Sequence, residues 1–427
     1  MFERPRGGER AVLVHVDFGA DVERDRLEFQ TLVASTGAEI AALVTVQRGS
    51  PDVKFFIGSG KVAEVGEAVV NFDASLVIFG HELSPSQERN LEKSLQCRVV
   101  GRSGLILDIF AQRARSFEGK LQVELAQLRH LSTRLIRGWT HLERQKGGIG
   151  LRGPGETQLE TDRRLIGERI KQIHRRLERV ARQRDQGRQK RRKREQPTVA
   201  LVGYTNAGKS TLFNALTDAG TYAADQLFAT LDPTLRRVAL PNGETVVAAD
   251  TVGFIRALPV ELIKAFRSTL QETSEANLLL HVQDASATDH LTMAAEVRGV
   301  LDDIGASALP VLDVYNKIDC LDLAPRIERD ETGRIQRVWL SAATGQGLDL
   351  LLQAVAERLG EDTVHGFVRL PFHASRQRAQ LFNSGAVVGE QLNPDGEWLI
   401  EVHTSRKNLA RLCHREGLRE EWMELAN

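Results

Sequence analysis

The chain has 427 residues, and its 57 lysines and arginines are balanced by 57 aspartates and glutamates. This length predicts several domains, and three scattered cysteines are too few for a disulfide framework or a zinc site, which indicates a reducing compartment. No apolar stretch reaches the length of a membrane-spanning helix, and the start Met1-Phe2-Glu3 is not that of a signal peptide. We therefore expect a cytoplasmic protein without a membrane span.

Residues 1–115 alternate between apolar runs and helical patterns. Strands are predicted at 11–16, 40–46, 75–79 and 98–100, and helices near 25–36, 61–71 and 85–95. This order predicts an α/β domain with a mainly parallel sheet. The segment Ser84-Pro85-Ser86-Gln87 is typical of a capped helix start. Gly58-Ser59-Gly60-Lys61 also opens a helix and could hold an anion, but it is too short a signal to predict a nucleotide site.

Residues 116–196 are predicted to form a helical hairpin. Leucines recur with helical spacing from Leu121 to Leu142, and apolar residues then alternate in steps of four and three from Ile166 to Val180, as in a coiled coil. Two helices joined by a short break pack antiparallel. The break between them contains five glycines at 147–155. Such a tip suits a backbone that enters a narrow crevice, and the alternative is a flexible connector.

The second arm of this hairpin is strongly basic. Residues 163–194 contain 15 Lys or Arg and 3 acidic residues, and Arg188–Arg194 is almost continuously basic. A charge run is often only a solvated face. This length and density nevertheless favour binding to an anionic polymer such as RNA, with affinity arising from counterion release.

A phosphate-binding loop begins the next predicted domain, residues 197–362. An apolar strand ends at Val202, a glycine-rich loop follows, and a helical pattern comes next. Glycine lets backbone N–H groups turn toward phosphate oxygens, and the helix start adds its positive dipole end. Lys209 is expected to reach the β- and γ-phosphates, and the Ser210 hydroxyl to ligate Mg²⁺. The predicted binding residues are Gly203, Tyr204, Thr205, Asn206, Ala207, Gly208, Lys209, Ser210 and Thr211.

A second motif is expected to sense the γ-phosphate. It consists of Asp250, Thr251, Val252 and Gly253, and it follows a predicted hairpin with an Asn242-Gly243 turn. Asp250 is expected to hold Mg²⁺ through water, and the Gly253 N–H to meet the γ-phosphate.

The segment Phe228-Ala229-Thr230 is predicted to supply a second hydroxyl to Mg²⁺. Thr230 is the first candidate, and Thr234 is an alternative that spacing alone does not exclude. Segments 222–234 and 250–260 would then be two switches, ordered by the γ-phosphate and released on hydrolysis. Lys209, Thr230 and Gly253 are the predicted catalytic residues.

Phe254 stands where Ras-like enzymes carry a glutamine that orients the attacking water. A phenyl ring cannot form that hydrogen bond. Either intrinsic hydrolysis is slow and completed by a partner or another group, or Phe254 is a packing residue and the water is positioned elsewhere.

The predicted base site recognises guanine. Asn316, Lys317 and Asp319 directly follow the apolar strand Val311–Tyr315. The Asp319 carboxylate can accept two hydrogen bonds from guanine, whereas adenine would leave it unpaired at a cost of roughly 1–3 kcal/mol. Asn316 is expected to tie this loop to the phosphate loop. Ser341 and Ala342 are expected to offer backbone N–H groups to the guanine O6.

Residues 363–427 are predicted to form a small α+β domain. Strands at 366–370, 386–392 and 398–403 surround helices, and 394–396 is a Pro-Asp-Gly turn. The segment has no catalytic signature, and it is too short for a large core of its own.

Taken together, these segments resemble the HflX-type translational GTPases of the Obg-HflX group. The most specific are GGIGLRGPGETQ at 147–158, GYTNAGKS at 203–210, FATLDPT at 228–234 and DTVGF at 250–254. The resemblance covers nearly the whole chain and is weakest after residue 363. The expected fold class is α/β and multidomain: an N-terminal α/β domain, a helical hairpin, a P-loop G domain with a mainly parallel sheet, and a small C-terminal α+β domain.

The resemblance implies a GTPase that binds the large ribosomal subunit and its rRNA and splits ribosomes with GTP, notably under stress. The glycine-rich loop would be aimed toward the peptidyl-transferase region. Asn206 stands where a subset of G proteins use asparagine to help hold K⁺, so K⁺ joins Mg²⁺ as an expected cofactor. Some members are credited with ATP use by the N-terminal domain, where this chain has no full phosphate-loop motif. We expect a monomer.

Two alternative functions stay open at the level of the sequence. One is a GTP-switched adaptor whose coiled coil binds protein. The other is a GTPase that assists ribosome assembly or RNA modification.

Overall fold

The computed structural model describes residues 8–19, 22–135, 158–193, 196–217, 227–228, 230–231, 234–256, 272–360, 363–393 and 396–426. By their contacts these residues divide into two compact units. The first contains the chain up to Val180, with the described residues of 224–232 and Arg256. The second contains the rest, including the phosphate loop and the C-terminal strands. The domain limits expected at 115, 196 and 362 stay predictions.

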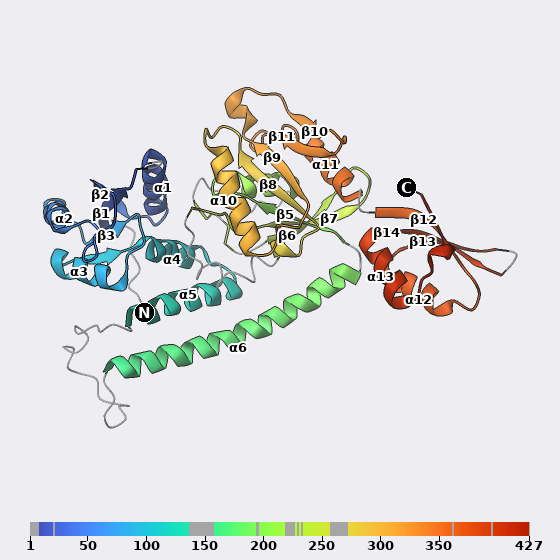
Figure 1. The fold of residues 1–427 in the computed structure, drawn as a ribbon, viewed down its shortest axis with the longest axis horizontal. Helices are drawn as coiled ribbons and strands as arrows, with labels where there is room; N and C mark the ends of the chain where they lie inside the picture. The colour runs from blue at the N-terminus through green and yellow to red at the C-terminus, as the bar shows by residue number, and fades with distance from the viewer. Residues whose placement is uncertain are drawn as a thin grey trace. The chain divides into compact units, whose positions relative to one another are not determined.

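A four-stranded parallel sheet begins the first unit. Its strands are β1 (Arg10–Asp17), β2 (Glu39–Gln47), β3 (Leu76–Phe79) and β4 (Arg98–Val100), in the order β2-β1-β3-β4 (Figure 1). β1 is buried along almost its whole length, as expected for a parallel strand covered on both faces. Because β1 pairs with β2 on one side and β3 on the other, the chain reverses its direction of winding between β1 and β3.

Four helices accompany this sheet: α1 (Val22–Ala34), α2 (Ser59–Asn71), α3 (Pro85–Leu95) and α4 (Arg102–Arg113). Side chains alternate between the two faces of a strand. Val12 and Val14 of β1 pack in one core cluster with residues of α2 and α3, so His15 of β1 points to the other face. The capped start of α3 is confirmed, because the Ser84 side chain accepts the Gln87 N–H and the Gln87 side chain accepts the Ser84 N–H.

The helices α5 (Phe117–Leu135) and α6 (Gln158–Lys193) pack against each other. Their shared core contains Leu121, Leu125 and Ile173, and Ile173 is fully buried. Arg169 of α6 donates two hydrogen bonds to the Glu124 carboxylate of α5, at 2.6 and 3.0 Å. The leucine and isoleucine spacings therefore correspond to a helix–helix seam. The glycine-rich tip lies outside the described residues.

A seven-stranded sheet forms the centre of the second unit, in the order β10-β11-β9-β8-β5-β7-β6. The five inner strands are parallel, and the edge strands β6 and β10 pair antiparallel with their neighbours. The strands are β5 (Thr198–Val202), β6 (Thr234–Ala239), β7 (Thr245–Asp250), β8 (Leu278–Asp284), β9 (Val311–Asn316), β10 (Arg326–Arg329) and β11 (Ile335–Trp339).

The helices of this part are α7 (Lys209–Thr217), α10 (His290–Asp303) and α11 (Leu348–Gly360), with the 3₁₀ turn η2 (Ile318–Leu321). α7 and α11 bury Leu212, Phe213, Leu351 and Ala354 in one core with β5, β8 and β9. The hairpin predicted around Asn242-Gly243 is confirmed, with Ala239 opposite Thr245 in the β6–β7 pairing. Strands β8 and β10 were not predicted.

The C-terminal strands form an antiparallel sheet in the order β13-β14-β12-β15. They are β12 (Thr363–Leu370), β13 (Val387–Leu392), β14 (Trp398–Ser405) and β15 (Met423–Ala426), and the helices are α12 (Ser375–Ser384) and α13 (Arg406–Glu416), with the short η3 (Glu420–Trp422). Val368, Ile400, Leu381 and Leu412 join both helices to the sheet. The predicted fold class, including an α+β C-terminal part, is confirmed.

We predict that Ile173→Ala weakens the packing between α5 and α6. The side chain is fully buried, and an isoleucine-to-alanine change in a core costs about 2–4 kcal/mol through lost burial and the cavity left behind. Urea denaturation, with hydrogen exchange of α5 peptides, measures the loss. Leu165→Ala on the same helix is the matched control, because Leu165 is half exposed. Equal effects of the two substitutions would contradict the packing described here.

Candidate nucleotide-binding site

The glycines of the phosphate loop are required by close contacts. The loop joins β5 to α7, and Gly203 and Gly208 have φ angles of 151° and 88°. A Cβ atom at Gly203 would lie 2.2 Å from the carbonyl oxygen of Val282 in β8. A Cβ atom at Gly208 would lie 2.2 Å from Nδ2 of Asn316 in β9. Both distances are impossible for a side chain, so the loop conformation depends on glycine at these positions.

Lys209 is a cation held away from water at the start of α7. Its side chain is buried, and Nζ donates a 2.6 Å hydrogen bond to the carbonyl of Tyr204. Burial lowers the pKa of Lys209 to about 8, although Asp250 opposes that shift. An anion at this position would return the stabilisation that burial removes. The environment of Lys209 is therefore suited to a phosphate group.

Ser210 and Asp250 bring two hard oxygen atoms together. Ser210 Oγ donates to Asp250 Oδ2 at 2.9 Å, and Asp250 is buried at the end of β7. The next residue, Thr251, is fixed because its hydroxyl donates to the carbonyl of Leu201. Hydroxyl and carboxylate oxygens are ligands that Mg²⁺ prefers.

The segment after Asp250 lies directly against the phosphate loop. The Thr205 N–H donates to the carbonyl of Phe254 at 2.7 Å, and the Phe254 N–H donates to the carbonyl of Gly203 at 3.1 Å. The Phe254 side chain is buried. This burial favours the interpretation of Phe254 as a packing residue. Gly253 also has little free space around it, since a Cβ atom there would lie 3.1 Å from Lys209 Nζ.

The described residues of the other predicted switch segment belong to the first unit, and their position against the phosphate loop stays a prediction. The ring of Phe228 is buried and contacts the ring of Phe110 in α4 edge-on, with centroids 4.7 Å apart. Thr230 is partly buried, and Ala229 lies outside the described residues. The alternative Mg²⁺ ligand, Thr234, begins β6 in the second unit and pairs in register with Asp250.

Asn316 connects the phosphate loop to the predicted base site. Its Nδ2 donates to the carbonyl of Ala207, and its Oδ1 accepts the N–H of Ala342, both at 2.9 Å. The expected link between the two loops is confirmed. Lys317, with a φ of 68°, follows and pairs with Asp284 at 2.6 Å.

The remaining base-site residues are only partly as expected. Asp319 is exposed in η2, where its carboxylate is accessible. The Ser341 N–H, however, donates to the carbonyl of Gln346, and the Ala342 N–H donates to Asn316. Both groups assigned to the guanine O6 therefore have acceptors within the protein. The spacing of the sequence could locate the loop at Ser341 and Ala342, but it could not show that other residues of the protein accept these two N–H groups.

A group of polar residues on β8 and β9 was not predicted from the sequence. His281 Nδ1 and Gln283 Nε2 each lie 2.9 Å from the Asp313 carboxylate, and His281 is buried. Asp284, at the end of β8, holds Lys317. The only available signal was polar residues within an apolar strand, which does not distinguish structural from functional roles.

A mainly parallel sheet with a glycine loop between β5 and α7, a buried lysine after it, and an asparagine that links the two nucleotide loops define the P-loop class of GTPases. Three family models match in chain order: "GTP-binding GTPase N-terminal" at 23–111, "GTP-binding GTPase Middle Region" at 113–191 and "50S ribosome-binding GTPase" at 198–317. The matched residues cover most of the chain before the C-terminal strands.

Comparison with curated proteins gives the family. The chain is 57% identical to the GTPase HflX of Escherichia coli over 419 residues, covering 97% of this chain and 98% of that protein. It is 45% identical to the GTPase HflX of Caldanaerobacter subterraneus, covering 93% and 91%. This chain belongs to the HflX family, and it is a GTPase.

A solved structure is also similar: a GTP-binding protein from the archaeon Sulfolobus solfataricus in complex with GDP, 23% identical, with a TM-score of 0.44. The alignment covers 83% of this chain and 99% of that one.

Among the described residues, every helix is too short or too polar to cross a membrane.

We predict that Gly208→Ala strongly weakens GTP binding. The added methyl group would collide with Asn316 and force a φ that alanine disfavours, so the loop must move. Titration with a fluorescent GTP analogue should show a loss of about tenfold or more, equivalent to about 1.4 kcal/mol. Gly299→Ala, in α10 with open space around it, is the control and should keep normal affinity. A Gly208→Ala variant with normal affinity would show that the loop tolerates the methyl group.

Proposed function

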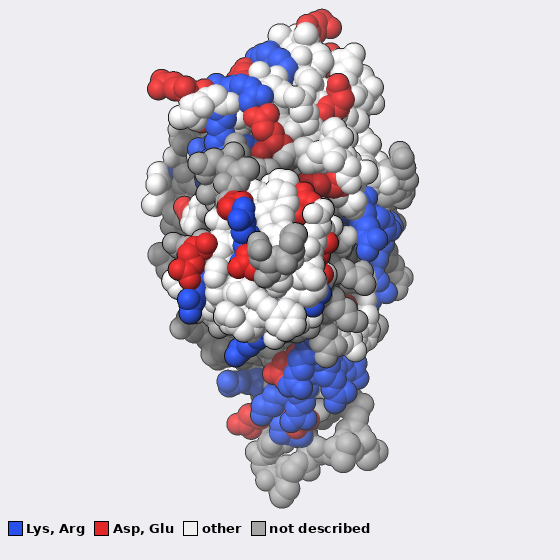
Figure 2. Space-filling view, turned by 90° about the vertical axis from the view of Figure 1, so that its right-hand side faces the viewer, with Lys and Arg blue, Asp and Glu red and all other residues white. Residues whose placement is uncertain are grey.

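We propose that this GTPase acts in the cytoplasm as a monomer, binds rRNA of the large ribosomal subunit and splits ribosomes with GTP, particularly under stress. The observation that carries this proposal is the exposed basic surface of α6. Its members in the described side chains are Arg163, Arg164, Lys171, Arg175, Arg176, Arg179 and Arg182. Figure 2 has a cluster of Lys and Arg low in the view, at the height of the first half of α6. The "50S ribosome-binding GTPase" match supports the same partner.

The geometry of α6 supports an RNA surface more than a protein-binding one. The apolar side of α6, with Ile170 and Ile173, already packs on α5, so it is not available to a partner helix. The exposed charged residues of α6 are mainly cationic, with Glu160, Glu168 and Glu178 as the exposed acids among its described side chains. Such a surface binds phosphates through many interchangeable contacts.

The proposed roles in the GTPase site follow the contacts described above. Lys209 would neutralise the β- and γ-phosphates, and Gly253 would contact the γ-phosphate through its N–H. Ser210, Asp250 and Thr230 would hold Mg²⁺, which when bound neutralises charge on the phosphate oxygens. The Ser210–Asp250 oxygen pair supports this donor set. Because Gly253 is close to Lys209, a γ-phosphate would have to displace the segment that contains Gly253 and Phe254.

Guanine would be selected by Asp319. We propose that its exposed carboxylate accepts the ring N–H and the exocyclic amine, while Lys317 covers the base. The O6 atom would share the Ala342 N–H with Asn316 Oδ1, because that donor is already bonded.

We predict that Asp319→Asn changes the nucleotide preference. The substitution replaces a hydrogen-bond acceptor with a donor opposite the purine edge, so GTP affinity should fall at least about tenfold while xanthosine triphosphate binds better. Competition against a fluorescent GTP analogue measures both. Asp322→Asn is the control, since Asp322 is exposed just beyond η2. Unchanged GTP affinity in Asp319→Asn would remove Asp319 from the base site.

We predict that K⁺ accelerates GTP hydrolysis more than Na⁺. Asn206 is exposed in the phosphate loop with a φ of 61°, and we propose that it helps to hold K⁺, which would stabilise developing charge. Steady-state rates in the two salts at equal ionic strength test this. Asn206→Ala should lose the difference, and Asn242→Ala should keep it. Equal rates in the two salts for the parent protein would exclude a K⁺ role.

We predict that reversing four charges on α6 weakens ribosome binding. Arg175, Arg176, Arg179 and Arg182 changed to Glu should lower affinity at least about tenfold and flatten its salt dependence, because fewer counterions are released. Co-sedimentation with large subunits at several salt concentrations measures this. Arg236 and Arg237 changed to Glu, both exposed on β6, are the controls.

Experiments with the same protein and ribosomes distinguish the competing functions. On sucrose gradients, whole ribosomes should separate into subunits with the parent protein and a non-hydrolysable GTP analogue, but not with GDP. Binding that resists RNase and high salt would instead support a GTP-switched adaptor. Binding only to incomplete subunits would support an assembly factor.

A further inference from the structure

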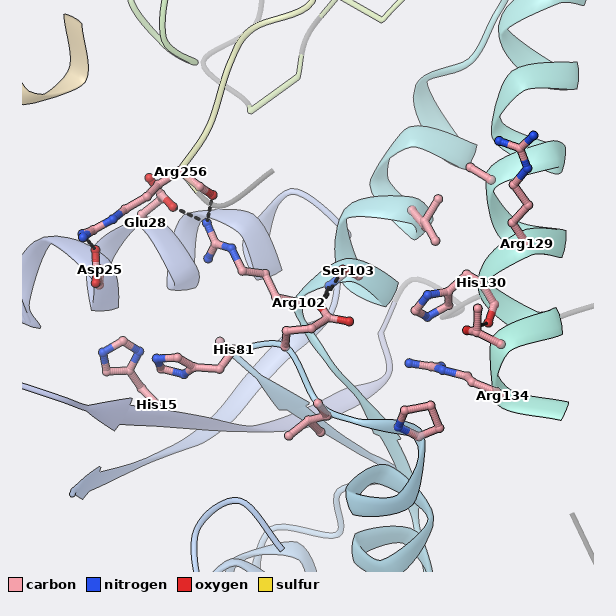
Figure 3. Close-up of a pocket in the computed structure, with 17 residues that line it drawn as sticks. His15, Asp25, Glu28, His81, Arg102, Ser103, Arg129, His130, Arg134 and Arg256 are labelled. Atoms are coloured by element: carbon pink, nitrogen blue, oxygen red, sulfur yellow. Dashed lines mark hydrogen bonds and ion pairs between the residues drawn. The ribbon is translucent and has the colours of Figure 1, made fainter. Parts of the chain in front are cut away.

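A cavity of about 640 Å³ lies in the first unit, outside the carboxyl ends of the parallel sheet. Its walls come from β1, α1, the segment after β3, the starts of α3 and α4, and α5, with Arg256 completing them (Figure 3). The strand order β2-β1-β3-β4 reverses its winding between β1 and β3. His15 of β1 and His81, just after β3, line the cavity from that reversal point. Ligands of open α/β sheets bind in this position, and the volume is typical of a small-molecule site.

The polar groups of the cavity that lack a partner are nitrogen atoms. Within the described residues, His15 Nδ1, His81 Nδ1, His130 Nε2 and Arg102 Nε are buried without a hydrogen bond. His15 is only 3% exposed. In Figure 3 the rings of His15 and His81 lie on one side of the cavity and His130 with Arg134 on the other, with Arg102 and Ser103 between them. A buried polar atom without a partner costs roughly 1–3 kcal/mol, so these nitrogens form an incomplete site.

The carboxylates of the cavity, by contrast, are engaged. Asp25 pairs with Arg256 at 2.7 Å, and Glu28 pairs with Arg102. Glu82 accepts the N–H and the hydroxyl of Ser103. With these acceptors used and the nitrogens open, the complementary ligand is one rich in acceptor oxygens.

The imidazoles of this cavity are kept neutral by their surroundings. Burial, followed by the nearby His15 and Arg102, lowers the pKa of His81 to about 4. Burial, followed by Arg134, lowers the pKa of His130 to about 4. A bound anion would oppose both causes and raise these pKa values. Anion binding would therefore take up protons, and affinity would rise as the pH falls.

We propose that this cavity binds a phosphate dianion, either free phosphate or the phosphate group of a small organic ester. The oxygens would accept from Arg102 and from the imidazoles of His15 and His81. Leu83, Pro85, Leu107 and Ala126 give the remaining wall an apolar character suited to the body of an ester. This site is separate from the phosphate loop, which belongs to the second unit.

The charges around the imidazoles come from every element that lines the cavity. They are Asp17 on β1, Asp25, Arg26 and Glu28 on α1, Glu82 after β3, Arg102 on α4, Arg129 and Arg134 on α5, and Arg256. Glu88 of α3 also faces this group, because it pairs with Arg134 at 2.8 Å, and burial raises the pKa of Glu88 to about 7. Protonation changes between about pH 6 and about pH 8 therefore involve Glu88 as well as the imidazoles, and the imidazole resonances described below tell the two apart.

Calorimetric titration of the full-length protein, saturated with GDP to fill the phosphate loop, tests the proposal. The probes are inorganic phosphate, ribose 5-phosphate and sulfate. Sulfate keeps its charge across the pH range, so its pH dependence reports on the protein alone. We expect phosphate binding, and sulfate binding at least about tenfold tighter near pH 6 than near pH 8, with proton uptake seen as a dependence on buffer ionisation enthalpy. Tighter binding of ribose 5-phosphate would identify an ester, and tighter binding of phosphate would identify the free ion.

Matched variants locate the binding. His81→Gln should weaken phosphate binding at least about tenfold, and His365→Gln, on the exposed part of β12, should leave it unchanged. Imidazole NMR resonances of the parent protein give a measurement that needs no variant, since those of His81 and His130 should move on adding phosphate. The proposal is overturned if no probe binds the GDP-saturated protein, or if binding is the same in His81→Gln. Neither outcome would affect the GTPase assignment, which concerns the other unit.

Discussion

One buried carboxamide holds the candidate nucleotide site together. Asn316 donates to Ala207 in the phosphate loop and accepts from Ala342 in the loop after β11, so the carboxyl ends of three strands share one side chain. The same side chain leaves room only for glycine at position 208. Because both hydrogen bonds are buried, loss of either would leave a buried polar group without a partner, at a cost of roughly 1–3 kcal/mol. The geometry around Lys209 and the accessible Asp319 both depend on this contact.

Each of the two units contains a basic side chain whose pKa is lowered by burial. Burial lowers the pKa of Lys209 to about 8 and that of His81 to about 4. In each case burial is the largest cause and a nearby carboxylate, Asp250 or Asp25, opposes it only in part, so an oxyanion could restore the balance. The lysine stays charged near neutral pH, whereas the imidazole stays neutral. The Lys209 site therefore already carries the charge that a phosphate group needs, whereas His81 would have to gain a proton when an anion binds.

Much of the architecture could be predicted because local signals agree with the fold. The strand, glycine loop and lysine at 199–209 need only neighbouring residues, and the isoleucines of α6 already indicated their shared seam with α5. Strands β8, β10 and β15 were not predicted; β10 and β15 are short and, unlike β5, lack a continuous apolar run. The internal acceptors of the Ser341 and Ala342 N–H groups could not be predicted, because a turn decides where an N–H points. His15, His81 and His130 meet only through tertiary folding, so no spacing in the sequence indicated the cavity.

The first unit is assembled from separate stretches of the chain, and this affects how any shortened protein should be interpreted. The ring of Phe228 is buried against Phe110 of α4, and Arg256 pairs with Asp25 of α1. A fragment beginning at residue 197 would keep Phe228 and Arg256 but lose both partners. It would expose an aromatic ring whose burial is worth about 1.5–3 kcal/mol and leave the segment around Phe228 without the residue it packs on. A changed hydrolysis rate in such a fragment would thus reflect the loss of these contacts as well as the loss of the first unit. Single substitutions such as Phe110→Leu in the full-length protein would test the contact alone.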